Sequence, residues 1–264
     1  MSLNNQTPKS YIAMSIRTVL MFCLLLGNLI LRADPQADFA KANNAYMAGF
    51  YGNAITIYEE ILSSGFESPD LYYNLGNAYF KNDELPKAIL NYERALKLNP
   101  GNEDYRFNLR FANDKLIDKI DTLPELFYIT WWNSLKNKLS ANNWAMLALV
   151  SFTLVFIVVI LFLLSRTALM KRALFYTGIL LILLHILSGI LAWQTKSEAR
   201  LRETAIVFAP NLPVKSSPDE SSIDLFVIHE GLKVQIIDKI GEWNEIKIGN
   251  GSKGWVKSET LERI

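Results

Sequence analysis

The amino-acid sequence predicts a multidomain membrane protein with three parts: an all-α solenoid of helical repeats, two transmembrane helices and a small all-β barrel. Three observations lead to this fold class. The chain resembles itself at an offset of 34 residues between positions 34 and 102. Two long apolar runs follow near the middle of the 264-residue chain, and short stretches of alternating apolar and polar residues occupy its end.

Residues 1–33 are typical of a signal peptide. Lys9 and Arg17 precede an apolar run at 18–31, which is too short for a stable membrane span. Cleavage after Ala33 would leave the following segment outside the cytoplasm, and an uncleaved anchor, the alternative, gives the same sidedness. Cys23, the only cysteine, lies in this run, so the processed chain would contain no disulfide and no thiolate.

Residues 34–120 predict a repeat domain. Ala54 and Ala88 are 34 positions apart, which is the period of the tetratricopeptide repeat. We expect a first copy at 34–68, a second copy at 69–102 and a closing helix at 103–120. The second copy resembles the family consensus through Tyr72, Leu75, Gly76, Tyr79, Ala88, Tyr92, Ala95 and Pro100.

Small side chains at Gly76 and Ala88 would let the two helices of the second copy approach closely. Repeats of this kind stack into a curved array whose first helices line a concave groove. The resemblance to the family places six residues on that inner face: Phe39, Asn43, Tyr46, Tyr73, Asn77 and Phe80.

Asn43 and Asn77 resemble the asparagines with which such repeat proteins hold a peptide backbone. The lysine that accompanies them in members that clamp a terminal carboxylate is absent, because Phe39 and Tyr73 occupy the matching places. We therefore expect an extended apolar peptide as the ligand, with both amides largely solvated until it binds. Helix packing alone is the alternative role for the aromatic residues.

Residues 121–143 predict a juxtamembrane amphipathic segment. A break at 121–124 precedes apolar residues at every fourth position, among them Phe127, Trp131 and Leu135. A short helix lying in the lipid headgroup layer is one interpretation, and packing against the closing repeat helix is the other.

The two apolar runs, 144–164 and 173–193, are each long enough to cross a membrane as a helix. The loop between them, 165–172, is basic and has no acidic residue, which predicts a cytoplasmic position. Both arms would then lie on the periplasmic side of the inner membrane. Within the second run, His185 is expected to bond to the hydroxyl of Ser151 or Thr153 in preference to relaying protons.

Residues 194–204 predict a charged stalk that continues the second span, and residues 205–264 predict a small barrel of short strands. This last region resembles the bacterial SH3-like family through Glu230, Gly231, Trp243 and the Gly-Trp-Val sequence at 254–256. Trp243 and Trp255 could offer an aromatic surface to a peptide or to cell-wall material. Burial of at least one of them in the core is the alternative.

The residue inventory argues against an enzyme. The processed chain would have no cysteine and only two histidines, His185 and His229, which excludes Cys-His catalysis and histidine metal clusters. We therefore expect no catalytic residue, no metal and no cofactor, although hydrolysis by carboxylates alone stays open. The net charge of +1, with no strongly basic domain, argues against nucleic acid as a partner.

The whole combination resembles the BatE family of the Bacteroides aerotolerance operons. Besides the repeats, the hairpin and the SH3-like region, the resemblance rests on the Leu-Pro-Glu-Leu-Phe sequence at 123–127 and on Trp131 and Trp132. It implies a non-enzymatic envelope scaffold that binds other Bat membrane proteins with von Willebrand type A domains, together with a MoxR-type ATPase. A sensor that binds peptidoglycan through the SH3-like domain is the alternative function. In both cases the lipid bilayer is a further partner.

Overall fold

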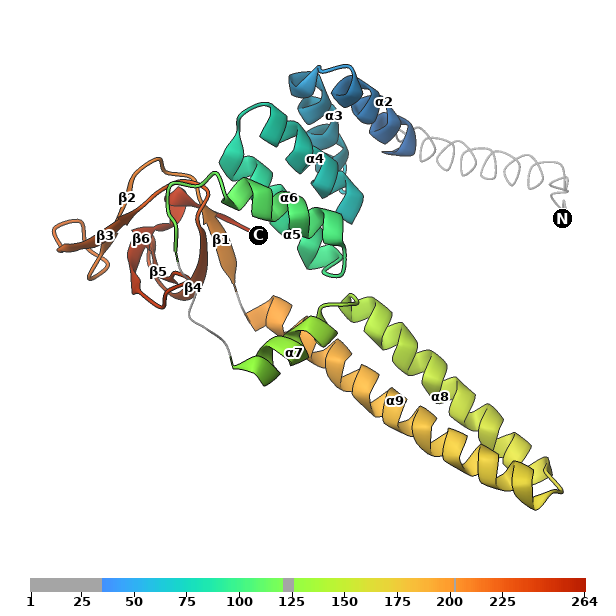
Figure 1. Cartoon of the computed structure of the whole chain (residues 1–264). Coiled ribbons are helices and arrows are strands. Elements are labelled where there is room, and N and C mark those ends of the chain that lie inside the picture. The colour runs from blue at the N-terminus through green and yellow to red at the C-terminus, as the bar shows by residue number, and fades with distance from the viewer. Residues whose placement is uncertain (1–34, 121–125, 202) are drawn as a thin grey trace, which may run out of the picture.

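The computed structural model describes residues 35–120, 126–201 and 203–264. It consists of a helical repeat region, a helical hairpin and a C-terminal antiparallel β-sheet, which we call the β domain (Figure 1). The coarse fold class expected from the sequence is therefore present. The predicted signal peptide at 1–33 and the predicted break at 121–124 lie outside the described residues.

The repeat region is a stack of antiparallel helices. Ser68 begins the second pair, because its hydroxyl accepts a hydrogen bond from the backbone N–H of Leu71 (3.1 Å). Asn102 caps the last helix in the same way, through the backbone N–H groups of Asp104 and Tyr105. The helices are α2 (Pro35–Met47), α3 (Tyr51–Ser63), α4 (Pro69–Lys81), α5 (Leu85–Leu98) and α6 (Glu103–Asn113).

Gly76 lies where α4 is in direct contact with α5. A Cβ atom at this position would lie 2.8 Å from two ring carbons of Tyr92 and 3.3 Å from the carbonyl oxygen of Ala88. The Tyr92 side chain is only 2% exposed and has no room to move away. The predicted close contact between Gly76 and the second helix of its repeat is confirmed.

The closing helix is shorter than predicted. Helix α6 ends at Asn113, and residues 115–120 leave the repeat region to run along the β domain. Leu116 accounts for this path, because its side chain packs over Gly231 of the β domain beside Ile89 of α5. An apolar contact with another domain has replaced the last turns of the expected helix.

The hairpin consists of α8 (Ala141–Leu164) and α9 (Ala168–Leu201). Both helices are long and apolar enough to cross a membrane, by length and composition. Only residues 165–167 connect them, so Lys171 and Arg172 of the predicted loop lie in the first turns of α9. Helix α9 also continues through most of the predicted stalk.

His185 bonds to the backbone and not to a hydroxyl. Its Nδ1 lies 2.9 Å from the carbonyl oxygen of Ala148, while Ser151 and Thr153 donate to carbonyls of their own helix. The expected partners of His185 were therefore wrong. Ser151 and Ser188 are buried where the helices meet, and these small side chains let the backbones approach.

The β domain is a seven-stranded antiparallel sheet in the order β3-β2-β6-β5-β4-β1-β7. Its core contains residues at alternating positions along the strands, such as Val214, Val234 and Ile246. Asn250 and Gly251 form the turn between β5 and β6, where Gly251 has a φ of 92°. The strands are β1 (Thr204–Val207), β2 (Leu212–Lys215), β3 (Asp224–Ile228), β4 (Lys233–Ile240), β5 (Trp243–Lys247), β6 (Lys253–Lys257) and β7 (Leu261–Arg263).

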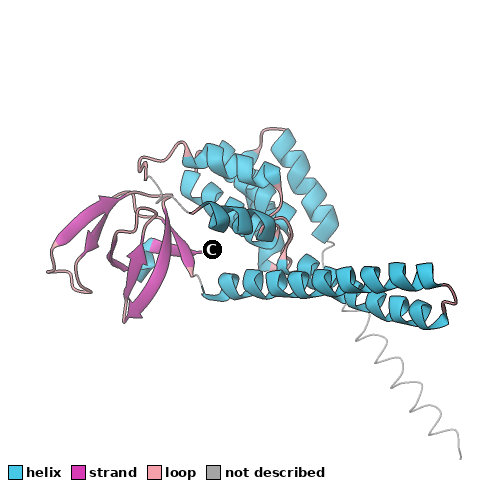
Figure 2. Ribbon diagram, turned by 60° about the horizontal axis from the view of Figure 1, so that its bottom comes forward, coloured by secondary structure: helices cyan, strands magenta, loops and turns pink. Residues whose placement is uncertain are grey.

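The β domain packs directly on α5, a contact that the sequence did not predict. Ile206 of β1 is fully buried in the same apolar cluster as the repeat helices. Lys233 pairs with Glu93 (2.6 Å), and Arg94 pairs with Glu262 (3.2 Å). Figure 2 shows the sheet and the repeat helices lying side by side. The two arms are therefore joined to each other as well as to the hairpin.

Candidate partner-binding groove

Two neighbouring hollows form a groove on the face of the repeat region that α2, α4 and α6 share. Their volumes are about 250 and 300 Å³, and both include Tyr46 and Asn77 in their walls. No residue of the β domain lines either hollow, so the domain that covers α5 leaves the groove open. The groove is lined by Asn43, Tyr46, Met47, Tyr58, Asn74, Asn77, Phe80, Lys81, Tyr92, Phe107, Asn108 and Phe111.

The floor of the groove is a ladder of amides and phenols that repeats from one helix pair to the next. Asn43 Oδ1 accepts from the Tyr58 hydroxyl (2.6 Å) and from Asn74 Nδ2 (3.0 Å). One repeat later, Asn77 Oδ1 accepts from the Tyr92 hydroxyl (2.8 Å) and from Asn108 Nδ2 (2.8 Å). Each asparagine thus ties its own repeat to the next helix.

The ladder corrects the expectation that Asn43 and Asn77 are largely solvated. Their side-chain oxygens each hold two donors and are already used within the protein. Within the described residues, the Nδ2 groups of Asn43 and Asn77 make no hydrogen bond. Each amide therefore keeps two N–H donors for a ligand. These two residues can therefore support the fold and still contact a partner.

The predicted aromatic residues divide into packed and open positions. Phe39 lies 5.9 Å from the Tyr58 ring, and Tyr73 stacks on Tyr105 at 4.6 Å, so both serve chiefly in packing. Phe80 is partly exposed and lies 5.6 Å from Phe111. Tyr46 lines both hollows. Of the six predicted residues, Asn43, Tyr46, Asn77 and Phe80 border the groove.

Burial controls the ionisation of the phenols beneath the groove. Burial, followed by the nearby Tyr46 hydroxyl, raises the pKa of Tyr58 to about 12. Burial likewise raises the pKa of Tyr92. Both phenols stay protonated at neutral pH and can act as donors to the asparagine oxygens.

Sequence reasoning missed eight groove residues, among them Asn74, Asn108, Phe107 and Phe111. The signal was present, because Asn74 and Asn108 are 34 positions apart, as are Tyr73 and Phe107. Helix α6 therefore follows the repeat pattern and is more than a closing helix. Phe107 and Phe111 remain 60% and 51% exposed, which leaves an aromatic wall open to a ligand.

Trp243 and Trp255 lie on the outside of the β domain. Neither belongs to its core cluster, because their neighbours Asn244 and Val256 are the inward residues of β5 and β6. The pairing of Glu245 with Trp255 sets the two indoles on the same face of adjacent strands. Both are partly exposed, and burial of one of them in the core is not the arrangement found.

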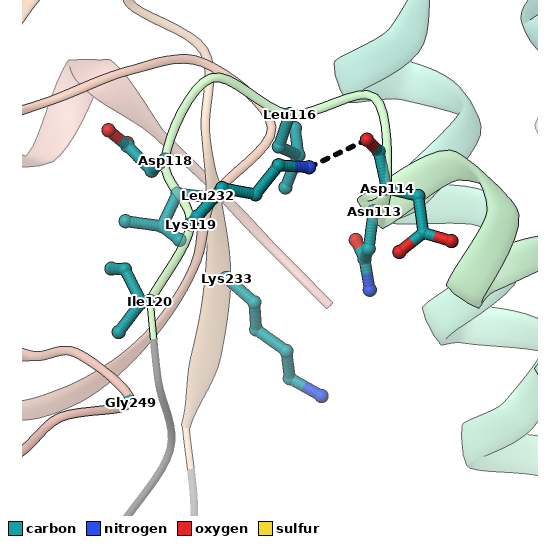
Figure 3. A pocket seen from close by; sticks show the side chains of 9 residues that line it. All are labelled: Asn113, Asp114, Leu116, Asp118, Lys119, Ile120, Leu232, Lys233 and Gly249. Atoms are coloured by element: carbon teal, nitrogen blue, oxygen red, sulfur yellow. Dashed lines mark hydrogen bonds between the residues drawn. The ribbon is translucent and has the colours of Figure 1, made fainter.

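A larger hollow of about 460 Å³ lies between residues 113–120 and the β domain (Figure 3). Both lysines that line it already have partners: Lys119 Nζ donates to the carbonyl oxygen of Asp114 (2.6 Å), as the dashed line shows, and Lys233 pairs with Glu93. Asp118 likewise accepts from the backbone N–H of His229 and lies 2.8 Å from its Nδ1. This hollow is a junction between domains, and we assign partner binding to the groove.

Among the described residues, no group of three or more histidine, cysteine or carboxylate side chains is placed to hold a metal ion.

The chain was compared with known proteins. No curated protein matches it. Residues 69–102, which contain α4 and α5, match the tetratricopeptide repeat model. This stretch of the chain is therefore a tetratricopeptide repeat, a module that typically mediates protein–protein interactions.

Proposed function

We propose that the protein is a non-enzymatic membrane scaffold that binds a protein partner in the groove of its helical repeats. The observation that carries this proposal is the combination of free amide donors and exposed aromatic side chains in one open groove. Asn43 and Asn77 supply the donors, while Phe107 and Phe111 supply the apolar wall.

An extended segment of the partner fits this chemistry best. The Nδ2 groups of Asn43 and Asn77 recur at the repeat spacing and would donate to carbonyl oxygens along its backbone. The pocket between Phe80, Phe107 and Phe111 would receive an apolar side chain. Because each asparagine oxygen is held by two internal donors, the amides are oriented before the partner arrives, which reduces the entropy lost on binding.

The setting we propose is the inner membrane, with the repeat region and the β domain on the periplasmic side. The basic residues at the α8–α9 turn and the signal-like start of the chain support this sidedness. The resemblance to the BatE family supports partners among the Bat membrane proteins with von Willebrand type A domains. The β domain would then be a bacterial SH3-like module.

Photo-crosslinking tests the groove in the full-length protein. A photoreactive phenylalanine analogue replaces Phe107 or Met47 in the groove, and Phe66, an exposed aromatic residue outside it, is replaced as the control. We expect one membrane protein to be crosslinked from both groove positions and not from position 66. Equal crosslinking at all three positions would refute the groove assignment, whereas a partner without a von Willebrand type A domain would refute only the Bat setting.

A second function is favoured by the positions of Trp243 and Trp255. Two indoles on one outer face of a sheet form a flat surface of the kind that stacks on sugar rings, which suits a cell-wall sensor. Cosedimentation of the full-length protein with purified peptidoglycan tests this function. Trp243→Ala with Trp255→Ala should abolish sedimentation, while Ile223→Ala, which removes an exposed apolar residue just before β3, should not. Unchanged sedimentation of the double variant would exclude the indole surface.

A further inference from the structure

Helix α7 (Phe127–Lys136) joins the hairpin to the repeat region through two of its faces. On the first face, Trp132 Nε1 donates to Gln194 Oε1 of α9 (2.8 Å), and Lys136 pairs with Glu198 (2.5 Å). On the second face, Thr130, Asn133 and Ser134 line a hollow that they share with Gly101 and Arg106 of the repeat region.

The third face of α7 is aromatic and uncovered. Phe127 is 85% exposed, Tyr128 55% and Trp131 66%. At 100° per residue these three side chains fall within one arc of roughly 100°, on the side of the helix opposite Asn133. Their only ring contact among the described residues is the one between Phe127 and Tyr128 (5.8 Å). The face is continuous, and none of its three residues lines the hollow that α7 shares with the repeat region.

The hydrogen bonds to α9 set the height of α7 along the hairpin. Gln194 follows directly after Trp193, the last residue of the second apolar run, and Glu198 lies one helical turn further. At ~1.5 Å per residue, the contacts of α7 fall about 2 to 8 Å beyond the level of Trp193. Trp144, at the start of the first apolar run, donates to the carbonyl oxygen of Lys136 (2.9 Å). Figure 1 shows α7 lying across α9 at the end of the hairpin away from its turn.

We propose that the aromatic face of α7 is a lipid-binding surface that lies in the headgroup layer of the membrane crossed by α8 and α9. This inference rests on the proposed membrane crossing. A headgroup layer is roughly 5–8 Å thick, which matches the height of α7 above the apolar runs. Amphipathic rings such as those of Tyr128 and Trp131 favour this layer over water or hydrocarbon. The bilayer surface would then cover the third face of α7, which the protein leaves exposed.

The lipid contact would also orient the repeat region. Gly101 packs directly on the end of this segment, since a Cβ atom there would clash with the carbonyl oxygen of Lys138. With its aromatic face in lipid, α7 lies between the membrane surface and the repeat helices. The groove is then held at a constant height and tilt above the bilayer.

Spin-label accessibility in liposomes tests the proposal. The full-length protein carries Cys23→Ser, and single cysteines are introduced as Phe127→Cys or Trp131→Cys on the aromatic face. Asn133→Cys, on the repeat-facing side of the same helix and opposite the aromatic face, is the matched control, and Leu154→Cys in α8 reports on the hydrocarbon core. The liposomes contain phosphatidylethanolamine and phosphatidylglycerol. Collisions with oxygen report lipid, and collisions with a water-soluble nickel chelate report water.

We expect the oxygen-to-nickel ratio at positions 127 and 131 to exceed that at 133 by roughly twofold or more, and to stay below that at 154. Equal ratios at 127, 131 and 133, with an oxygen-dominated signal at 154, would overturn the lipid contact and leave the membrane crossing intact. A nickel-dominated signal at 154 would overturn both. Neither outcome depends on partner capture by the groove, which is measured separately.

Discussion

Replacement of Asn77 by alanine should loosen the second repeat, because one oxygen atom there serves two donors. Asn77 Oδ1 accepts from the Tyr92 hydroxyl and from Asn108 Nδ2, each at 2.8 Å. The Tyr92 side chain is 2% exposed, so its hydroxyl would lose an acceptor without gaining water. A buried donor left unsatisfied costs about 1–3 kcal/mol, and the second bond adds roughly 0.5–1.5 kcal/mol. We expect the free energy of opening α4 and α5 to fall by about 2–4 kcal/mol.

Hydrogen exchange of the full-length protein in detergent, read by mass spectrometry, measures this opening. A loss of 2–4 kcal/mol should accelerate exchange of the protected amides in α4 and α5 by roughly 30- to 1,000-fold. Asn44→Ala is the control, since Asn44 is exposed and its side chain makes no hydrogen bond to the described part of the chain. If Asn77→Ala exchanged no faster than Asn44→Ala, the ladder would not support the fold.

Asn77→Asp separates the structural role of Asn77 from its role in binding. A carboxylate keeps the acceptor for Tyr92 and Asn108 but removes the Nδ2 donors that face the groove. Exchange in α4 and α5 should therefore stay near the wild-type rate, while crosslinking of the partner from position 107 should fall. Undiminished crosslinking in this variant would show that the partner does not use the amide of Asn77.

Three further outcomes follow from the packing. Gly76→Leu should destabilise the second repeat by at least ~1–3 kcal/mol through overpacking against Tyr92, and an unchanged exchange rate in α4 would contradict the close contact. Ile206→Ala should cost about 2–5 kcal/mol and expose α5, and unaltered protection of α5 would show that the β domain does not stabilise it. The raised pKa of Tyr58, about 12 against its ordinary 10, stabilises the fold fully below pH 10. This contribution, roughly 2–3 kcal/mol, should be lost as the pH rises to 12, so Tyr58→Phe should show a smaller decrease in stability over that interval.

Local periodicity explains what the sequence could predict. The small residue at Gly76 and the 34-residue offset locate α4 and α5, because the contact between paired helices imposes a repeating steric requirement. The same offset would have revealed Asn74 and Asn108, which reach back to the asparagine of the preceding repeat. The double role of Asn43 and Asn77 was not evident, since a consensus position does not say which of its atoms is already bonded.

Contacts between segments far apart in the sequence leave no periodic pattern in it. Ile206 and Leu116 look like ordinary apolar residues of a strand and a helix end, yet both lie at the junction of the repeat region and the β domain. The ion pair between Lys233 and Glu93 joins residues 140 positions apart. Pairings of this kind depend on how whole domains meet, which neither spacing nor composition records.

The packing of the β domain on α5 closes the chain into a mechanical ring. The path leads from α5 through α6 and α7 into α8, returns along α9 to β1, and ends against α5 again. A force on the repeat helices is therefore transmitted to both helices of the hairpin. Rotation of α9 about its axis is transmitted to α5 through Ile206. Cutting the backbone at the α8–α9 turn would open the ring there, and the packing of α8 on α9, with the contact of His185 to Ala148, would then carry the whole load between the two helices.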